Sequence, residues 1–124
     1  MTVSRRAVMA SALLAPLAAK AGTVDAPDKY GLIGQMKARP GQRDALIAIL
    51  LEGSDAMPGC LAYVVAKDSA DADAIWITEL WDSKASHAAS LTLPAVRAAI
   101  ARGRPLIAGF GTSAQTMPVG GKGL

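Results

Sequence analysis

The segment Ala74–Trp81 predicts a strand that is apolar on both of its faces. Side chains alternate along an extended chain, so one face carries Ile75, Ile77, Glu79 and Trp81 and the other carries Trp76, Thr78 and Leu80. A strand of this kind needs cover on both sides of its sheet. The 124 residues suffice for one domain, so we expect a second chain to cover the face that the helices leave bare.

The remaining segments predict the other elements of the domain. Further strands are expected at residues 30–37, 60–67 and 106–110, and a helix at residues 42–52. A second helix begins at Lys84 after the capping residue Ser83, breaks near Pro94 and resumes to Arg102. The order β-α-β-β-α-β is that of the α+β, ferredoxin-like fold, whose helices cover one face of the sheet. The expected partner is therefore an identical chain across a two-fold axis.

Residues 1–21 have the three parts of a secretory signal: a basic start, an apolar middle and a small-residue end. The apolar run is too short to cross a bilayer, which takes roughly 20 helical residues. Arg5 and Arg6 resemble a twin-arginine export signal, and Lys20 precedes a cleavage site after Ala21. We expect an exported, periplasmic protein. The general secretory route and an uncleaved amphipathic helix remain alternatives.

The formal net charge of +3 lies in this predicted signal. Three of the 13 basic residues fall there, Arg5, Arg6 and Lys20, and none of the 10 acidic ones does. The mature chain is then neutral, which gives no support to nucleic-acid binding through phosphate contacts. We divide the rest into a flexible lead-in at 22–29, a domain at 30–111 and a flexible tail at 112–124.

The scarcity of cysteine and histidine restricts the possible metal and disulfide chemistry. Cys60 is the one cysteine, which excludes an intrachain disulfide and a cysteine-cluster metal site, and His87 is the one histidine. Asp68, Asp71 and Asp73 lie together between two predicted strands. Their spacing lacks the central glycine and the terminal glutamate of a calcium loop, so a solvated turn is the preferred interpretation.

One motif stands at the end of the third strand, where Glu79-Leu-Trp-Asp-Ser-Lys-Ala-Ser-His87 leads into the next helix. Pro58-Gly59-Cys60 precedes the second strand, and Leu93-Pro94 breaks the second helix. With the strand order, these motifs resemble the antibiotic biosynthesis monooxygenase family, especially its quinol monooxygenase members, over residues 30–111.

The resemblance implies a dimeric α+β barrel in which two four-stranded sheets face each other. It also implies that dioxygen oxidises a small quinol, phenol or polyketide-like aromatic without a metal or flavin cofactor. Haem-degrading relatives use an asparagine, a tryptophan and a histidine. This chain has no asparagine, so that set is incomplete and haem is disfavoured.

Oxygenation without a cofactor needs an electron-rich ring that loses its phenolic proton while water is kept out. His87 is the catalytic candidate, because imidazole titrates near neutral pH and because of its place in the family motif. The substrate-binding candidates are Trp76, Trp81, Tyr63, Glu79 and Phe110, with Tyr30 as the second phenol. Packing alone is the competing interpretation of each aromatic residue.

Two of these candidates carry a more specific expectation. Trp76 and Trp81 point to opposite faces of one strand, so at most one of them lines a given cavity. For Glu79 an ion pair with an arginine, such as Arg97 or Arg102, is preferred over a part in orienting the substrate. Two other functions stay open: a non-catalytic dimeric module that binds an aromatic or haem-like ligand, and an accessory subunit exported with a partner.

Overall fold

The computed structural model describes residues 28–124, so the signal predicted at residues 1–21 lies outside the described part. Its elements are β1 (Tyr30–Ala38), α2 (Arg43–Glu52), β2 (Cys60–Lys67), β3 (Ala74–Trp81), α3 (Lys84–Ser90), α4 (Pro94–Gly103), the short 3-10 helix η2 (Arg104–Leu106) and β4 (Ile107–Thr116). None of the helices described is long and apolar enough to cross a membrane.

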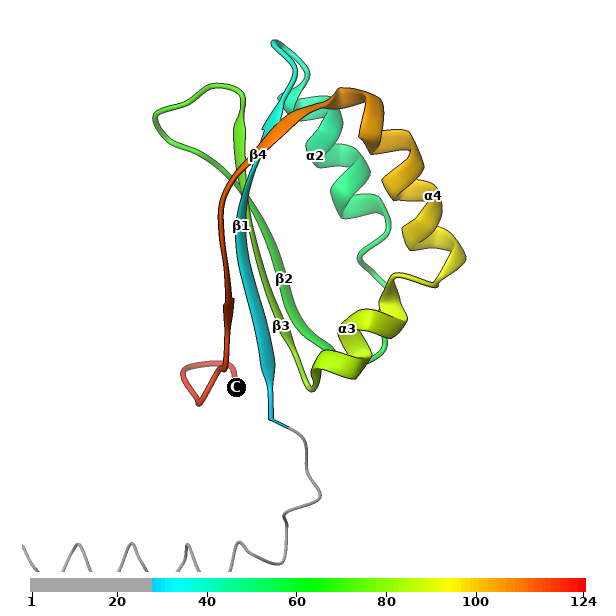
Figure 1. Cartoon of the computed structure of the whole chain (residues 1–124), viewed down its shortest axis with the longest axis vertical. Helices are drawn as coiled ribbons and strands as arrows, with labels where there is room; N and C mark the ends of the chain where they lie inside the picture. Colours follow the sequence, from blue (N-terminus) through cyan, green and yellow to red (C-terminus); the bar gives the residue numbers. More distant parts are fainter. Residues whose placement is uncertain (1–27) are drawn as a thin grey trace, which may run out of the picture.

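The four strands form one antiparallel sheet in the order β2-β3-β1-β4 (Figure 1). The two strands at its centre, β1 and β3, pair along almost their full length, from Tyr30 opposite Trp81 to Lys37 opposite Ala74. Each edge strand then adds to one of them. This strand order and the β-α-β-β-α-β sequence of elements confirm the predicted ferredoxin-like fold.

The helices α2, α3 and α4 all lie on one face of the sheet (Figure 1). Leu46 of α2 is fully buried, and it packs in one cluster with Ala38 of β1 and Ile75 of β3. At the other end of the sheet Trp81 is only 1% exposed, beneath α3. The helix-covered face thus has a tightly packed region at each end of the sheet.

The opposite face of the sheet has no covering element within residues 28–124 (Figure 1). Ile33, Thr78 and Val64 form one row across β1, β3 and β2 on this face, because the strand register sets them out of phase with Trp81. Ile33 is 40% exposed and Val64 is 53% exposed. We call this surface the bare sheet face. The prediction that the chain covers only one face of an apolar strand is confirmed for the described residues.

The turn between β2 and β3 is organised by the Asp68 carboxylate. It accepts the backbone N–H groups of Asp71 and Ala70, both at 2.8 Å, the Trp76 indole N–H at 2.8 Å and the Gln35 amide at 3.3 Å. These bonds, the backbone ones foremost, hold the pKa of Asp68 at about 2. The segment is a turn between two strands, as predicted, and the Asp68 side chain is bonded to the turn's own backbone.

Strand β4 is longer than the sequence predicted. The sequence predicts a strand that ends at Phe110 and a flexible tail over residues 112–124, whereas β4 continues to Thr116. Pairing with β1 explains the extension, since Ile33 lies opposite Ala114 in the ladder. The partner strand supplies backbone hydrogen bonds that small residues of low strand propensity would not secure alone.

Candidate functional site

Glu79, Trp81 and His87 form a polar cluster between β3 and α3. The Trp81 indole Nε1–H donates to Glu79 Oε1 at 3.0 Å, and His87 Nε2 lies 3.9 Å from the same oxygen. The His87 ring meets Trp81 edge-on, with 5.4 Å between centroids. The side chains of Glu79 and His87 are only 18% and 20% exposed. A carboxylate beside an imidazole in a water-poor site is suited to holding and passing a proton.

The position of His87 depends on how α3 begins. Ser83 Oγ accepts the backbone N–H of Ser86 at 3.1 Å, which caps the helix as the sequence predicted. Gly59, just before β2, has a positive φ of 87° and its carbonyl accepts the N–H of Asp82 at 2.8 Å. A Cβ atom at Gly59 would lie 2.5 Å from the Ser86 side chain, so the first turn of α3 packs directly on glycine backbone.

Tyr63 links this cluster to the rest of the helix-covered face. It lies opposite Glu79 in the β2–β3 ladder, where facing Cβ atoms are about 5 Å apart. Burial, and then the nearby Glu79 charge, raises the pKa of Tyr63 to about 12. Its phenol is therefore a neutral hydrogen-bond donor at physiological pH and not a base.

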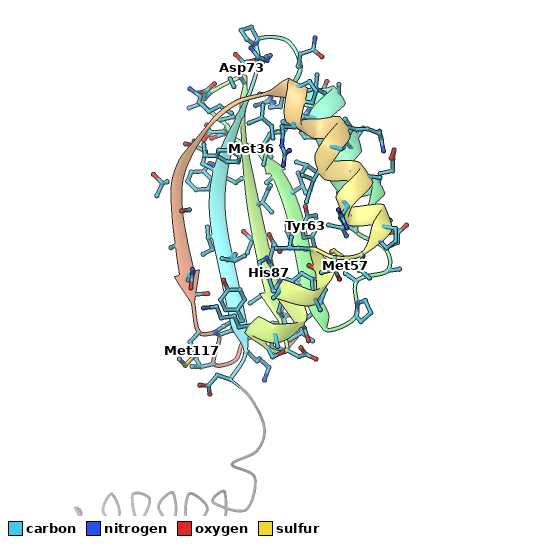
Figure 2. All side chains as sticks on the ribbon, turned by 45° about the vertical axis from the view of Figure 1, so that its right-hand side comes forward. Met36, Met57, Tyr63, Asp73, His87 and Met117 are labelled. Atoms are coloured by element: carbon cyan, nitrogen blue, oxygen red, sulfur yellow. The ribbon has the colours of Figure 1, made fainter. Side chains whose placement is uncertain are left out.

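A pocket of about 560 Å³ lies between the sheet and the helices α2 and α4, and we call it the helix-side pocket. Figure 2 shows Met36 and Tyr63 pointing from the sheet toward these helices, with Met57 beyond the end of α2. The apolar side chains that line it are Met36, Leu46, Ile49, Leu50, Met57, Val96, Ala99, Ile100, Ile107, Ala108 and Phe110. An apolar pocket with a few polar side chains in its lining is a typical site for a small aromatic ligand.

His87 does not line this pocket, whereas Tyr63 does. Glu79 neighbours both residues, since it faces Tyr63 across the ladder and His87 across the cluster. The pocket and the polar cluster are thus adjoining parts of one region, joined at Tyr63 and Glu79. Within residues 28–124 no three His, Cys, Asp or Glu side chains are placed to hold a metal ion.

A model of the family described as "antibiotic biosynthesis monooxygenase" matches residues 29–102. The chain belongs to this family. A crystal structure from Chloroflexus aurantiacus J-10-fl that carries the family's name is similar, at 68% identity, over 75% of this chain and 95% of that one, with a TM-score of 0.74. No curated protein matches the chain.

Two more distant structures show the same fold as this antibiotic biosynthesis monooxygenase domain. One, from Pseudomonas aeruginosa, is 22% identical over 77% of this chain and 98% of that one, with a TM-score of 0.66. The other, from Caulobacter crescentus CB15, is 19% identical over 77% and 93%, with a TM-score of 0.69. The shared architecture therefore extends well beyond close sequence similarity.

The candidate residues of this monooxygenase-family domain separate into three groups. His87, Glu79 and Trp81 come together in the polar cluster, and Tyr63 lies beside it. Phe110 lines the helix-side pocket but is 73% exposed, so it lies at the rim. Trp76 lies on the bare sheet face, bonded to Asp68, and contributes nothing to the pocket.

The prediction that Glu79 forms an ion pair with an arginine is wrong. Arg102 pairs with Glu52 of α2 instead, and among the described residues Glu79 makes no ion pair with Arg97. The geometric reason is that Trp81, two residues along the same strand face, brings its indole N–H to the Glu79 carboxylate. That i, i+2 spacing was the available sequence signal for this contact.

Sequence reasoning assigned no site role to the residues of α2 and α4 that form the pocket wall. The spacing of Leu46, Ile49 and Leu50 in one helix, and of Val96 and Ala99 in the other, indicates inward faces, and in the structure these residues line the pocket. Tyr30, the second phenol among the candidates, lies beside the polar cluster, with its ring centroid 5.4 Å from that of His87. Periodicity identifies inward faces and cannot tell a packed core from a lined pocket.

Proposed function

We propose that the protein is a cofactor-independent monooxygenase that oxidises a small quinol, phenol or polyketide-like aromatic with dioxygen. The observation that carries the proposal is the junction of an apolar pocket with a buried proton-handling cluster at Tyr63 and Glu79. The family assignment supports the class of reaction. The pocket supports the class of substrate, because its walls offer apolar surface to a neutral ring.

The proposed reaction balances without a further reactant. A hydroquinone and one dioxygen give a hydroxyquinone and one water. One oxygen atom enters a new carbon–oxygen bond, and the other leaves as water with two hydrogens of the substrate. The substrate supplies all four electrons that reduce dioxygen, so the protein's part is to remove a proton, hold the ring and exclude water.

Each residue of the site then has a specific part. The neutral Tyr63 phenol donates a hydrogen bond to the substrate oxygen at the floor of the pocket. The Glu79–His87 pair, next to it, takes up the phenolic proton. Trp81 positions the Glu79 carboxylate through the 3.0 Å hydrogen bond from its indole. The Cys60 thiol takes no part, since burial raises its pKa and disfavours the thiolate.

Oxygen uptake by the purified domain tests this proposal. We expect consumption of dioxygen with a panel of hydroquinones, and a loss of about 100-fold or more in kcat for His87→Ala, the range typical of a removed general base. Glu79→Gln retains an acceptor for the Trp81 indole and removes the negative charge. It therefore separates the structural role of the Glu79 side chain from its role in taking up the substrate's proton. Arg102→Ala, at the exposed ion pair with Glu52, is the matched control. No uptake across the panel, or full activity in His87→Ala, would refute the proposal.

A non-catalytic binding module is the second candidate, favoured by the almost wholly apolar lining of the pocket. It predicts tight retention of an aromatic ligand with no oxygen uptake. A haem-like ligand is the weaker form of this candidate, because His87 does not line the helix-side pocket and the Tyr63 phenol stays protonated.

Two further proposals concern the context of the domain. The bare sheet face, with Ile33 and Val64 exposed, supports a homodimer in which two such faces pack together. The composition of residues 1–21 supports export to the periplasm through a twin-arginine-like signal. Fractionation of cells that produce the whole chain tests the second, with Arg5→Lys and Arg6→Lys together expected to block export.

A further inference from the structure

We propose that the ligand of the helix-side pocket is a phenol or quinol that carries an alkyl chain, with its hydroxyl at Tyr63 and its chain between α2 and α4. The inference rests on the proposed function for the chemistry of the ring and adds the class of substituent. Three features of the pocket carry it: its volume, the chemistry of its lining, and the position of the Tyr63 hydroxyl.

The volume exceeds what a bare ring needs. A cavity of about 150 Å³ in another protein holds benzene, whereas this pocket has about 560 Å³. The pocket is partly open to solvent, so a ring placed at Tyr63 would leave most of its apolar walls in contact with water, which is unfavourable. A ligand that fills the pocket therefore extends well beyond one ring.

The lining decides what the extension is made of. Only Ser54, Tyr63 and Arg104 bring polar side chains to the pocket. The Ser54 hydroxyl donates to the Leu51 carbonyl at 2.8 Å, and Arg104 is exposed, so neither offers a buried polar contact to a ligand. A sugar, phosphate or carboxylate in the interior would lose its hydration without replacement. An alkyl chain has no hydrogen bonds with water to lose, and its burial contributes favourable free energy.

The same contacts fix the direction of the ligand. Among the described residues that line the pocket, Tyr63 is the polar side chain that is neither exposed, like Arg104, nor bonded to the backbone, like Ser54, so the hydroxylated ring belongs at its side. The chain then runs among Ile49 and Leu50 of α2 and Ala99 of α4. Met36 and Met57 lie along the pocket, and their unbranched side chains adapt to chains of different length.

Calorimetric binding of para-alkylphenols under argon tests the inference without turnover. From ethyl to hexyl, we expect Kd to fall about two- to fourfold for each added methylene, and to level off once the pocket is full. Tyr63→Phe should weaken every member of the series by the same factor, because it removes the contact at the ring and leaves the chain contacts intact. Affinity that is independent of chain length would overturn the inference.

Two variants locate the binding in the pocket. Ala99→Phe fills part of the space beside α4. The affinity of this variant for the alkylphenols should therefore level off at a shorter alkyl chain than in the parent protein. Met57→Trp, in the loop after α2, provides the same test if Ala99→Phe does not fold. Leu51→Ser, at an exposed residue of α2 that does not line the pocket, is the matched control and should leave the series unchanged. Loss of the chain dependence in Leu51→Ser would place the binding outside the pocket and refute the inference.

Failure of this inference and failure of the proposed function give different results. Chain-dependent binding without oxygen uptake supports the alkyl-chain ligand and refutes the monooxygenase reaction. Oxygen uptake whose kcat/KM does not change with chain length refutes the alkyl-chain ligand and leaves the reaction standing.

Discussion

Tyr63 and Glu79 face each other across the β2–β3 ladder, on the side of the sheet that the helices cover. This pair joins the two halves of the candidate site, because Tyr63 lines the helix-side pocket and Glu79 lies within 3.9 Å of His87. A ligand ring at Tyr63 is therefore next to the group that would receive its proton.

Tyr63 should ionise late in an alkaline titration. Its pKa rises from 10 to about 12, chiefly through burial. Folding favours the protonated phenol, so this stabilisation is complete below pH 10 and is lost as the pH rises from 10 to about 12. The near-ultraviolet absorbance of tyrosinate measures it, and Tyr63→Phe should remove the late step. A titration in which Tyr63→Phe removes an early step would contradict the burial of this phenol.

Asp68 should make the fold sensitive to acid. Its pKa is lowered from 3.8 to about 2, mainly by hydrogen bonds from backbone N–H groups. The stabilisation is complete above pH 3.8 and is lost as the pH falls toward 2. Urea unfolding as a function of pH should show that Asp68→Asn is less stable than the parent protein at neutral pH and loses less stability in this window. Asp55→Asn, in an exposed loop, should behave like the parent protein throughout.

Val64→Lys should break the proposed homodimer. A lysine at the centre of the bare sheet face would bury its charge between two copies of that face, which is unfavourable. Light scattering after gel filtration should show a mass half that of the parent protein. Leu51→Lys, at a similarly exposed apolar residue of α2, should remain dimeric. A monomeric parent protein, or a dimeric Val64→Lys variant, would contradict the proposed interface.

Gly59→Ala should cost more stability than Gly41→Ala. Both glycines have positive φ values, 87° and 77°, so the backbone penalty is similar. A Cβ atom at Gly59 meets the Ser86 side chain at 2.5 Å, whereas nothing lies within 4 Å of a Cβ atom at Gly41. We expect Gly59→Ala to lose about 1–3 kcal/mol more in urea unfolding, the usual cost of overpacking. Equal losses would show that α3 moves freely away from Gly59.

Much of the fold could be predicted from the sequence, because short-range patterns determine it. Strong alternation and flanking turns gave the bounds of β2 and β3, and Ser83 marked the start of α3. The end of β4 could not be found in this way. Its last residues, glycine, serine, alanine and threonine among them, extend because β1 pairs with them, and pairing is a long-range property.

The candidate site was predicted only in part, for a similar reason. The motif from Glu79 to His87 lies within one strand and one helix, so its residues could be placed together from the sequence. The helix-side pocket arises where α2 and α4 meet β1 and β2, and no local pattern encodes the space between them. The partner predicted for Glu79 is wrong because an arginine of opposite charge was preferred over Trp81, which lies two residues away on the same face of the strand.

The two tryptophans lie five positions apart on β3 and face opposite ways. Trp81 is enclosed beneath α3, and Trp76 lies on the bare sheet face with its indole bound to Asp68. They are the chain's two tryptophans, so each single Trp→Phe variant leaves one tryptophan, whose emission can be excited selectively over that of the tyrosines. The emission of Trp81 alone then reports on the packing of α3, and that of Trp76 alone reports on the exposure of the bare sheet face. Events on the two sides of one sheet become separately observable in solution without any added label.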